Sequence, residues 1–336
     1  KNGPYQKFKT LTAGAYQQDG TWADPENKYL DKNPYVDAFF RWWPTLSKDL
    51  QTLRITGGEP STSPSFWKFL DRIRHEPVPH LNLSVNSNLG VKDGLIDKLI
   101  ETTNVLELGS YDIYTSNESY GPHAEYLRDG MDYQVWRNNV VRMIEEANIR
   151  QLVVMMTVNG LSLMSITEFM DDMMLLKKKY GKNMPTMDLN FLRWPAFMSP
   201  LNLPDEVKAE AGKKIQVWLD KHRDSGFLLE HEITQIQRVI DYIDVVKQGH
   251  SRAEEDIEKH FHDFKSFYVQ YDKRRGKDFK KTFPMLAEWY DTLEVDETIE
   301  DVKQTSGGME GWEIGEYKPD ILKKAKASAG SWTKIV

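Results

Sequence analysis

Apolar and polar residues follow two rhythms along the first two thirds of the chain, one typical of strands and the other of helices. Leu53 and Ile55 belong to an expected strand that ends at Gly57. A helix is expected to follow Ser63, with Pro64 at its first position. Its apolar face would carry four residues at helical spacing, namely Phe66, Phe69, Leu70 and Ile73.

Four further strand-like segments continue this alternation, at residues 80–88, about 105–116, 150–159 and 186–193. The segments between them have helical spacing, including one long amphipathic stretch that ends near Ala147. Ser165 and Glu168 are expected to form a capping box at the start of a methionine-rich helix. Five strand-helix alternations predict parallel βαβ units, arranged either as an open doubly wound sheet or as a barrel.

The segment 80–88 helps to choose between these two arrangements. Its apolar residues Leu81, Leu83 and Val85 share one face, whereas its asparagines and serine share the other. Asp188 and Asn190 repeat this polar side on the last strand. An open sheet would cover both faces with apolar helices, whereas a barrel can turn a polar face inward. We therefore expect an α/β fold with a partial (β/α) barrel.

The rhythm changes along the chain and suggests four regions. Residues 1–46 form an aromatic segment that we expect to be rich in loops, and residues 47–200 form the barrel. Residues 201–293 are expected to be a helical C-terminal region, with helices near 204–222, 230–246 and 256–271. Residues 294–336 lose the periodicity and are rich in charge, glycine and serine, so we expect a mobile tail.

Composition narrows the functional classes. The 336 residues carry a formal net charge of -7 with both signs interspersed, so no global basic field would attract nucleic acid or anionic membranes. No apolar run approaches the ~20 residues that span a bilayer, and we expect a cytoplasmic protein. The chain has no cysteine, which excludes disulfides, thiolate catalysis and cysteine-ligated metals within these residues.

Polar residues follow each expected strand, and functional side chains of a barrel cluster at the carboxyl ends of its strands. The first such end, Gly57-Gly58-Glu59, is the most distinctive. Glycine allows positive φ and close approach of the backbone to a ligand. Glu59 could accept a hydrogen bond from an ammonium group beside them.

In context this motif resembles a known family. "LRITGGEP" after the first strand, "SVNSN" at the end of the next and "YTSNESYGPHAEYLRDGMDYQVWRNNV" after the third resemble segments of radical S-adenosylmethionine enzymes, most closely the SPASM/twitch subgroup. The resemblance covers roughly residues 33–197, and a weaker similarity extends as far as Pro284. It implies a partial (β/α)6 TIM-like barrel.

The resemblance also implies the roles of individual residues. Gly57, Gly58 and Glu59 would bind the methionyl amino group of S-adenosylmethionine. Polar residues and an arginine would hold its ribose and carboxylate, and the matching positions are Asn86, Asn88, Ser116 and Arg128. Asn159 and Leu192 lie where later strands of the family meet the adenosine. The implied partners are a small-molecule or peptide substrate and an electron donor such as a flavodoxin or ferredoxin.

The sequence departs from the family in one large respect. The family holds a 4Fe-4S cluster with three cysteines spaced CxxxCxxC after its first strand, and the cluster reduces the cofactor to give a 5′-deoxyadenosyl radical that abstracts a substrate hydrogen. This chain has no cysteine. The lack of Met at position 1 and the five strands, one short of six, favour a truncated oxidoreductase that is inactive by itself, without its first strand and cluster loop.

Two alternatives remain open at the level of sequence. A degenerate, non-catalytic barrel could bind a nucleoside or a peptide in the same pocket. A barrel glycoside hydrolase would need a carboxylate pair, for which Glu107, Asp112 and Glu118 are the candidates. His260 and His262 are two residues apart and would diverge on a helix, so no metal site is expected from them.

Overall fold

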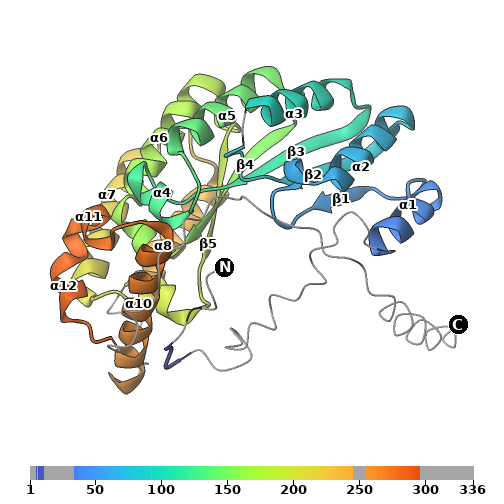
Figure 1. Ribbon diagram of the computed structural model, residues 1–336. Helices are drawn as coiled ribbons and strands as arrows, with labels where there is room; N and C mark the ends of the chain where they lie inside the picture. The colour runs from blue at the N-terminus through green and yellow to red at the C-terminus, as the bar shows by residue number, and fades with distance from the viewer. Residues whose placement is uncertain (1–4, 6, 11–33, 92, 245–253, 296–336) are drawn as a thin grey trace, which may run out of the picture. The chain divides into compact units, whose positions relative to one another are not determined.

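The computed structural model describes residues 5, 7–10, 34–91, 93–244 and 254–295 of the chain, and it shows an α/β fold (Figure 1). Five parallel strands form one sheet in the order β1-β2-β3-β4-β5. The strands are β1 (Thr52–Ile55), β2 (Val78–Asn86), β3 (Leu108–Ser116), β4 (Gln151–Val158) and β5 (Thr186–Phe191). The five predicted strands are therefore confirmed, with bounds that differ by a few residues.

Helices precede, separate and follow the strands. They are α1 (Pro34–Leu46), α2 (Pro64–His75), α3 (Asp93–Val105), α4 (Pro122–Leu127), α5 (Tyr133–Glu146), α6 (Ile166–Tyr180), α7 (Asp205–His222), α8 (Glu230–Ile243), α10 (Glu254–Arg275), α11 (Phe279–Thr282) and α12 (Ala287–Thr292). Helix α2 follows the prediction closely, because it begins at Pro64 and buries its four apolar residues.

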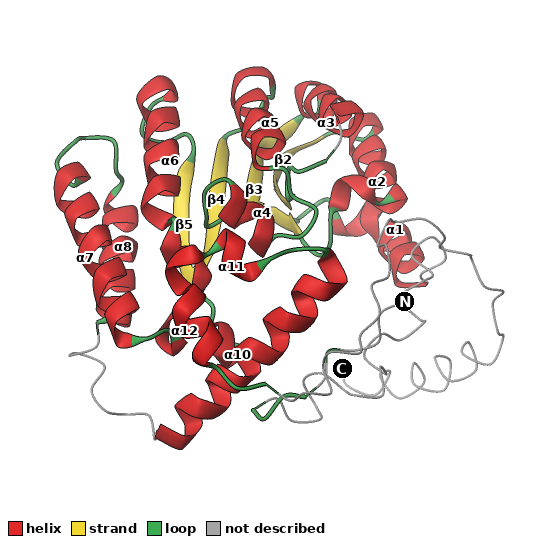
Figure 2. Ribbon diagram, turned by 60° about the vertical axis from the view of Figure 1, so that its left-hand side comes forward, coloured by secondary structure: helices red, strands yellow, loops and turns green. Residues whose placement is uncertain are grey.

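The sheet has one apolar and one polar face, as predicted from residues 80–88. The register aligns Leu53, Leu83 and Tyr111 on one face, and Arg54, Ser84 and Asp112 on the other. Leu81, Leu83 and Val85 are buried in the core, while Asn82 and Asn86 are only half-buried. Figures 1 and 2 show α2, α3, α5 and α6 along one side of the sheet, where their apolar residues join this core.

Helix α8 lies beside the edge strand β5 and binds its backbone directly. The Met187 N–H donates to Glu232 Oε1 at 2.7 Å, and the Leu189 N–H donates to Gln235 Oε1 at 2.9 Å. Two side chains thus satisfy edge amides that a further strand would otherwise pair.

A buried ion pair anchors the same helix. Lys177 of α6 lies 2.9 Å from Glu232 of α8, and both side chains are fully buried. Glu232 also accepts from the Leu229 N–H at 2.8 Å, and Lys177 donates to the Lys182 carbonyl at 2.6 Å. Burial of two charges is tolerated when their remaining hydrogen-bonding capacity is filled in this way.

Three local predictions are wrong. Residues 34–46, expected to be loop-rich, form α1, because Trp43 is buried edge-on against Phe69 of α2, with ring centroids 4.9 Å apart. The long amphipathic segment after β3 is divided into α4 and α5. Ser165 is the N-cap of α6 but forms no capping box, since its Oγ accepts from the Tyr120 N–H at 3.1 Å instead.

The helical character predicted beyond residue 200 is confirmed by α7, α8 and α10, and the described residues all belong to one unit. The second unit, residues 306–336, and most of the expected mobile tail lie outside the described residues. No helix in the described part of the chain has the length and apolar character needed to cross a membrane.

The contacts of Glu232 predict a large effect on stability. Glu232→Ala leaves Lys177 buried without its counter-ion and frees the Met187 amide, so the free energy of unfolding should fall by about 3–5 kcal/mol. Urea denaturation measures this change. The matched control is Glu210→Ala, which removes an exposed ion pair with Lys214 and should leave the free energy of unfolding nearly unchanged. Equal losses in both variants would contradict the prediction.

Candidate functional site

The carboxyl ends of parallel strands meet at one edge of the sheet, and the loops that follow them carry the predicted site residues. After β1 come Gly57, Gly58 and Glu59, and β2 ends at Asn86, which precedes Ser87 and Asn88. Ser116 ends β3, whereas Asn159 follows β4 and Leu192 follows β5. The fold therefore places all of these predicted residues at the same edge, and Arg128 follows α4.

The backbone requires glycine at the first position of the turn after β1. Gly57 has φ of 131°, in a region that side chains rarely adopt. Gly57 and Gly58 are both exposed, and a Cβ built at either position would meet nothing within 4 Å. The turn thus presents backbone groups to open space beside Glu59.

Glu59 joins the ends of the first two strands. Its Oε1 accepts from the Ser61 N–H at 3.1 Å, the Ser61 hydroxyl at 2.7 Å and the Ser87 hydroxyl at 2.9 Å. Its Oε2 accepts from the Asn88 N–H at 2.6 Å. A carboxylate has about four acceptor positions, two on each oxygen. Oε1 is therefore saturated by the described residues, whereas Oε2 retains capacity for one more donor.

The two predicted asparagines at the end of β2 and just beyond it differ in their surroundings. Asn88 is exposed, and its Oδ1 accepts from the Gly90 N–H at 2.8 Å. Asn86 is the last residue of β2 and lies on the polar face, where its Oδ1 accepts from Arg54 Nε at 3.0 Å. Asn88 thus borders Glu59, whereas Asn86 faces a neighbouring arginine.

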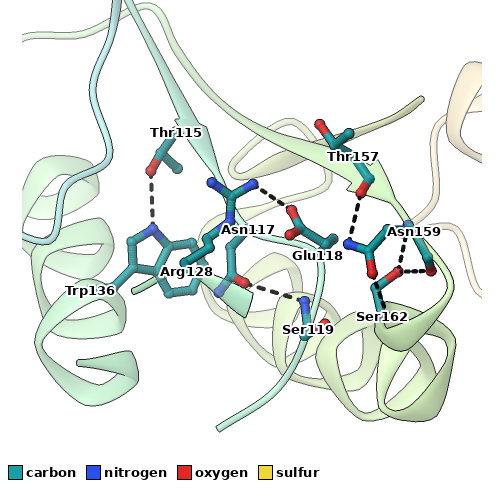
Figure 3. Close-up of polar contacts among 9 residues, drawn as sticks. All are labelled: Thr115, Asn117, Glu118, Ser119, Arg128, Trp136, Thr157, Asn159 and Ser162. Atoms are coloured by element: carbon teal, nitrogen blue, oxygen red, sulfur yellow. Dashed lines mark hydrogen bonds and ion pairs between the residues drawn. The ribbon is translucent and has the colours of Figure 1, made fainter. Parts of the chain in front are cut away.

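A second group of contacts forms where β3 and β4 end. Arg128 Nη2 lies 2.5 Å from Glu118 Oε2, and Figure 3 shows the two side chains pointing toward each other. The Glu118 side chain is 5% exposed. Burial raises the pKa of this carboxyl, and the nearby Arg128 and the backbone of Thr157 oppose that rise only in part. Arg128 thus engages a carboxylate, but it is one supplied by the chain itself.

Three buried polar atoms surround this ion pair without a partner among the described residues. They are Asn117 Nδ2, Ser119 Oγ and Arg128 Nε. Asn117 and Ser119 are fully buried, and Asn117 Oδ1 accepts from the Ser119 N–H at 3.2 Å. Buried donors normally have partners, so this group has hydrogen-bonding capacity that the described residues leave unused.

Of the remaining predicted residues, Asn159 stabilises a backbone turn, whereas Leu192 and Ser116 lie at the ends of β5 and β3. Asn159 Oδ1 accepts from the Ser162 N–H at 3.1 Å, and the Ser162 hydroxyl donates to the Asn159 carbonyl at 2.8 Å (Figure 3). The Leu192 N–H donates to the Val158 carbonyl at 2.9 Å. Ser116 is half-buried and shares the polar face with Met155, its register partner. Asn159, Leu192 and Ser116 all lie at the edge where a site is expected. The side-chain amide of Asn159, however, already forms hydrogen bonds within its own turn.

The described residues do not bring together the groups that a glycoside hydrolase or a histidine metal site would need. Glu107 precedes β3 and Glu118 follows it, so the nine-residue strand separates them by roughly 30 Å. Asp112 is buried in the middle of β3 and is paired with Arg150. His262 is buried beside Asp263 at 3.2 Å, and no group of three metal-ligating side chains occurs in the described ranges.

Sequence reasoning missed Arg54, Ser61 and Asn117 as members of the site. Arg54 had a usable signal, because it alternates with Leu53 and Ile55 and so had to share the polar face with Ser84. Ser61 and Asn117 had none, since their contacts depend on how the loops turn back.

Comparisons with known proteins do not assign this chain to a family. A scan against protein-family models and searches of curated proteins and solved structures find no match to this chain.

The raised pKa of Glu118 predicts how stability depends on pH. Folding favours the protonated carboxyl, so the stability it contributes is present at low pH and is lost as pH rises through the raised pKa. Glu118→Gln should remove this dependence. Between about pH 5 and about pH 8, the free energy of unfolding of the variant should therefore fall less steeply with rising pH than that of wild type.

Urea denaturation across this pH range measures the difference. Glu101→Gln, which changes an exposed glutamate on α3, should retain the wild-type pH dependence. The prediction fails if Glu118→Gln and wild type lose stability in parallel.

Proposed function

We propose that this chain is the S-adenosylmethionine-binding part of a radical S-adenosylmethionine oxidoreductase, with a partial (β/α)6 TIM-like barrel. The observation that carries the proposal is the open acceptor position on Glu59 Oε2, beside the exposed Gly57-Gly58 backbone. An ammonium group is a donor without acceptors, so the methionyl amine of the cofactor complements this carboxylate.

The surrounding residues support the same placement. Ser61 and Ser87 fix Oε1 and so orient the carboxylate before any ligand arrives. Asn117, Ser119 and Arg128 each have a buried polar atom with no partner among the described residues, and these atoms provide donors at the end of β3. Hydroxyl, carboxylate and adenine acceptors of a nucleoside could use such donors. When bound, S-adenosylmethionine supplies the group that is transferred or cleaved in this enzyme family.

The residues do not fit the second cofactor of the family. A 4Fe-4S cluster is held by cysteine thiolates, and these 336 residues contain none. We therefore derive no redox step from this chain and propose that it binds S-adenosylmethionine without cleaving it. The non-catalytic alternative, a barrel that binds a nucleoside or a peptide, uses the same strand ends and shares this behaviour.

Calorimetric titration with S-adenosylmethionine tests the proposal. Glu59→Gln keeps the size of the side chain but removes its charge, so the affinity should fall by about tenfold or more. Glu288→Gln alters an exposed glutamate on α12 and should leave the affinity unchanged. Circular dichroism would confirm that both variants are folded.

The two functional alternatives give different results. If wild type binds S-adenosylmethionine and adenosine equally and Glu59→Gln weakens neither, the site is a nucleoside pocket without an ammonium subsite. No heat of binding from S-adenosylmethionine at all would overturn the proposal. Chromatography after incubation should detect no 5′-deoxyadenosine from this chain alone.

A further inference from the structure

Arg54 occupies an unusual place on the polar face of the sheet. It belongs to β1, is exposed, and has no ion-pair partner within the described residues. Its Nε donates to Asn86 Oδ1 at 3.0 Å, and its guanidinium lies 4.1 Å from the centre of the Tyr114 ring. A third contact joins its Nη2 to the sulfur of Met155 at 3.5 Å. Three neighbouring strands therefore hold this one cation in place.

The platform beneath Arg54 is itself fixed by hydrogen bonds. The Tyr114 hydroxyl accepts from Gln151 Nε2 at 3.3 Å, and the same amide donates to Asp112 Oδ2 at 3.2 Å. Asp112 is neutralised by Arg150, whose Nε lies 2.9 Å from Asp112 Oδ1. Asp112, an acidic group that borders this platform, is thus already paired with Arg150, and no ion pair of the described residues compensates the charge of Arg54.

The guanidinium retains most of its donors. Arginine has five N–H groups in a planar fork, and the described contacts use one on Nε and one, with a weak sulfur acceptor, on Nη2. A stacked and oriented arginine binds planar oxyanions through paired hydrogen bonds, with little further loss of side-chain freedom. The unused donors therefore suit a carboxylate or a phosphate.

We propose that Arg54 is the anchor for an oxyanion of the substrate, a carboxylate or a phosphate, on the polar face of the sheet. The assignment of this anion to a substrate rests on the proposed function. Arg54 precedes Gly57 by three residues, so the anion would lie on the order of 10 Å from the proposed ammonium site. A substrate held there would extend from the polar face toward the strand ends.

Protection from phenylglyoxal, which modifies accessible arginines, tests the proposal in the wild-type chain. Inorganic pyrophosphate and glutarate serve as the phosphate and carboxylate probes, and peptide mapping by mass spectrometry follows Arg54. At least one probe should slow modification of Arg54 about tenfold. Exposed Arg74 on α2 is the internal control, and its rate should not change. The probe that protects identifies the type of oxyanion.

Variants test the same site by calorimetry. Arg54→Met, which removes the charge but keeps an extended apolar side chain, should weaken binding of the protecting anion about tenfold or more. Arg54→Lys keeps the charge but loses the fork, and should weaken binding by a smaller factor. Arg74→Met should bind the anion as wild type does. The Lys variant keeps the test valid if the Met variant does not fold.

Two results would overturn the inference. One is equal modification of Arg54 with and without both anions. The other is protection of Arg54 by S-adenosylmethionine alone, which would assign this arginine to the cofactor carboxylate. Failure of the proposed function is distinguishable, because anion protection of Arg54 in a chain that does not bind S-adenosylmethionine would retain the oxyanion site and refute only the cofactor site.

Discussion

The fold and the candidate site both depend on the difference in polarity between the two faces of the parallel sheet. One face carries aliphatic and aromatic residues and is covered by helices, which removes apolar surface from water. Strand geometry then forces the alternate residues onto the opposite face, where arginine, asparagine and aspartate side chains bond to one another across neighbouring strands. Burial of the apolar face stabilises the fold. The same burial therefore also places the polar side chains together beside the strand ends.

Much of this architecture could be predicted from local patterns. Period-two alternation in residues 80–88 identified both the strand and its polar face, and the spacing of four apolar residues identified α2. The errors have tertiary causes. Helix α1 depends on the packing of Trp43 against Phe69, and the hydroxyl of Ser165 is taken by the amide of Tyr120, 45 residues earlier in the chain. No window of neighbouring residues contains that information.

The candidate site was predictable in its location but not in its contacts. Reading the strand ends was enough to bring Gly57, Glu59 and Asn88 to one edge. The bond from Ser87 to Glu59 spans 28 residues, and it depends on the register of two strands and the turn after each. Likewise Arg128 meets Glu118 only because α4 ends where it does. Burial, which raises the pKa of Glu118, is a property of the whole fold.

The contacts between α8 and β5 have a consequence for assembly. An exposed edge strand is a template for pairing with other chains. Glu232 and Gln235 occupy amides of β5, so that end of the sheet is closed to such pairing. At the other end lies β1, a strand of only four residues with Thr52 and Arg54 exposed. Within the described part of the chain, the β1 side is therefore the edge of the sheet at which another strand could pair.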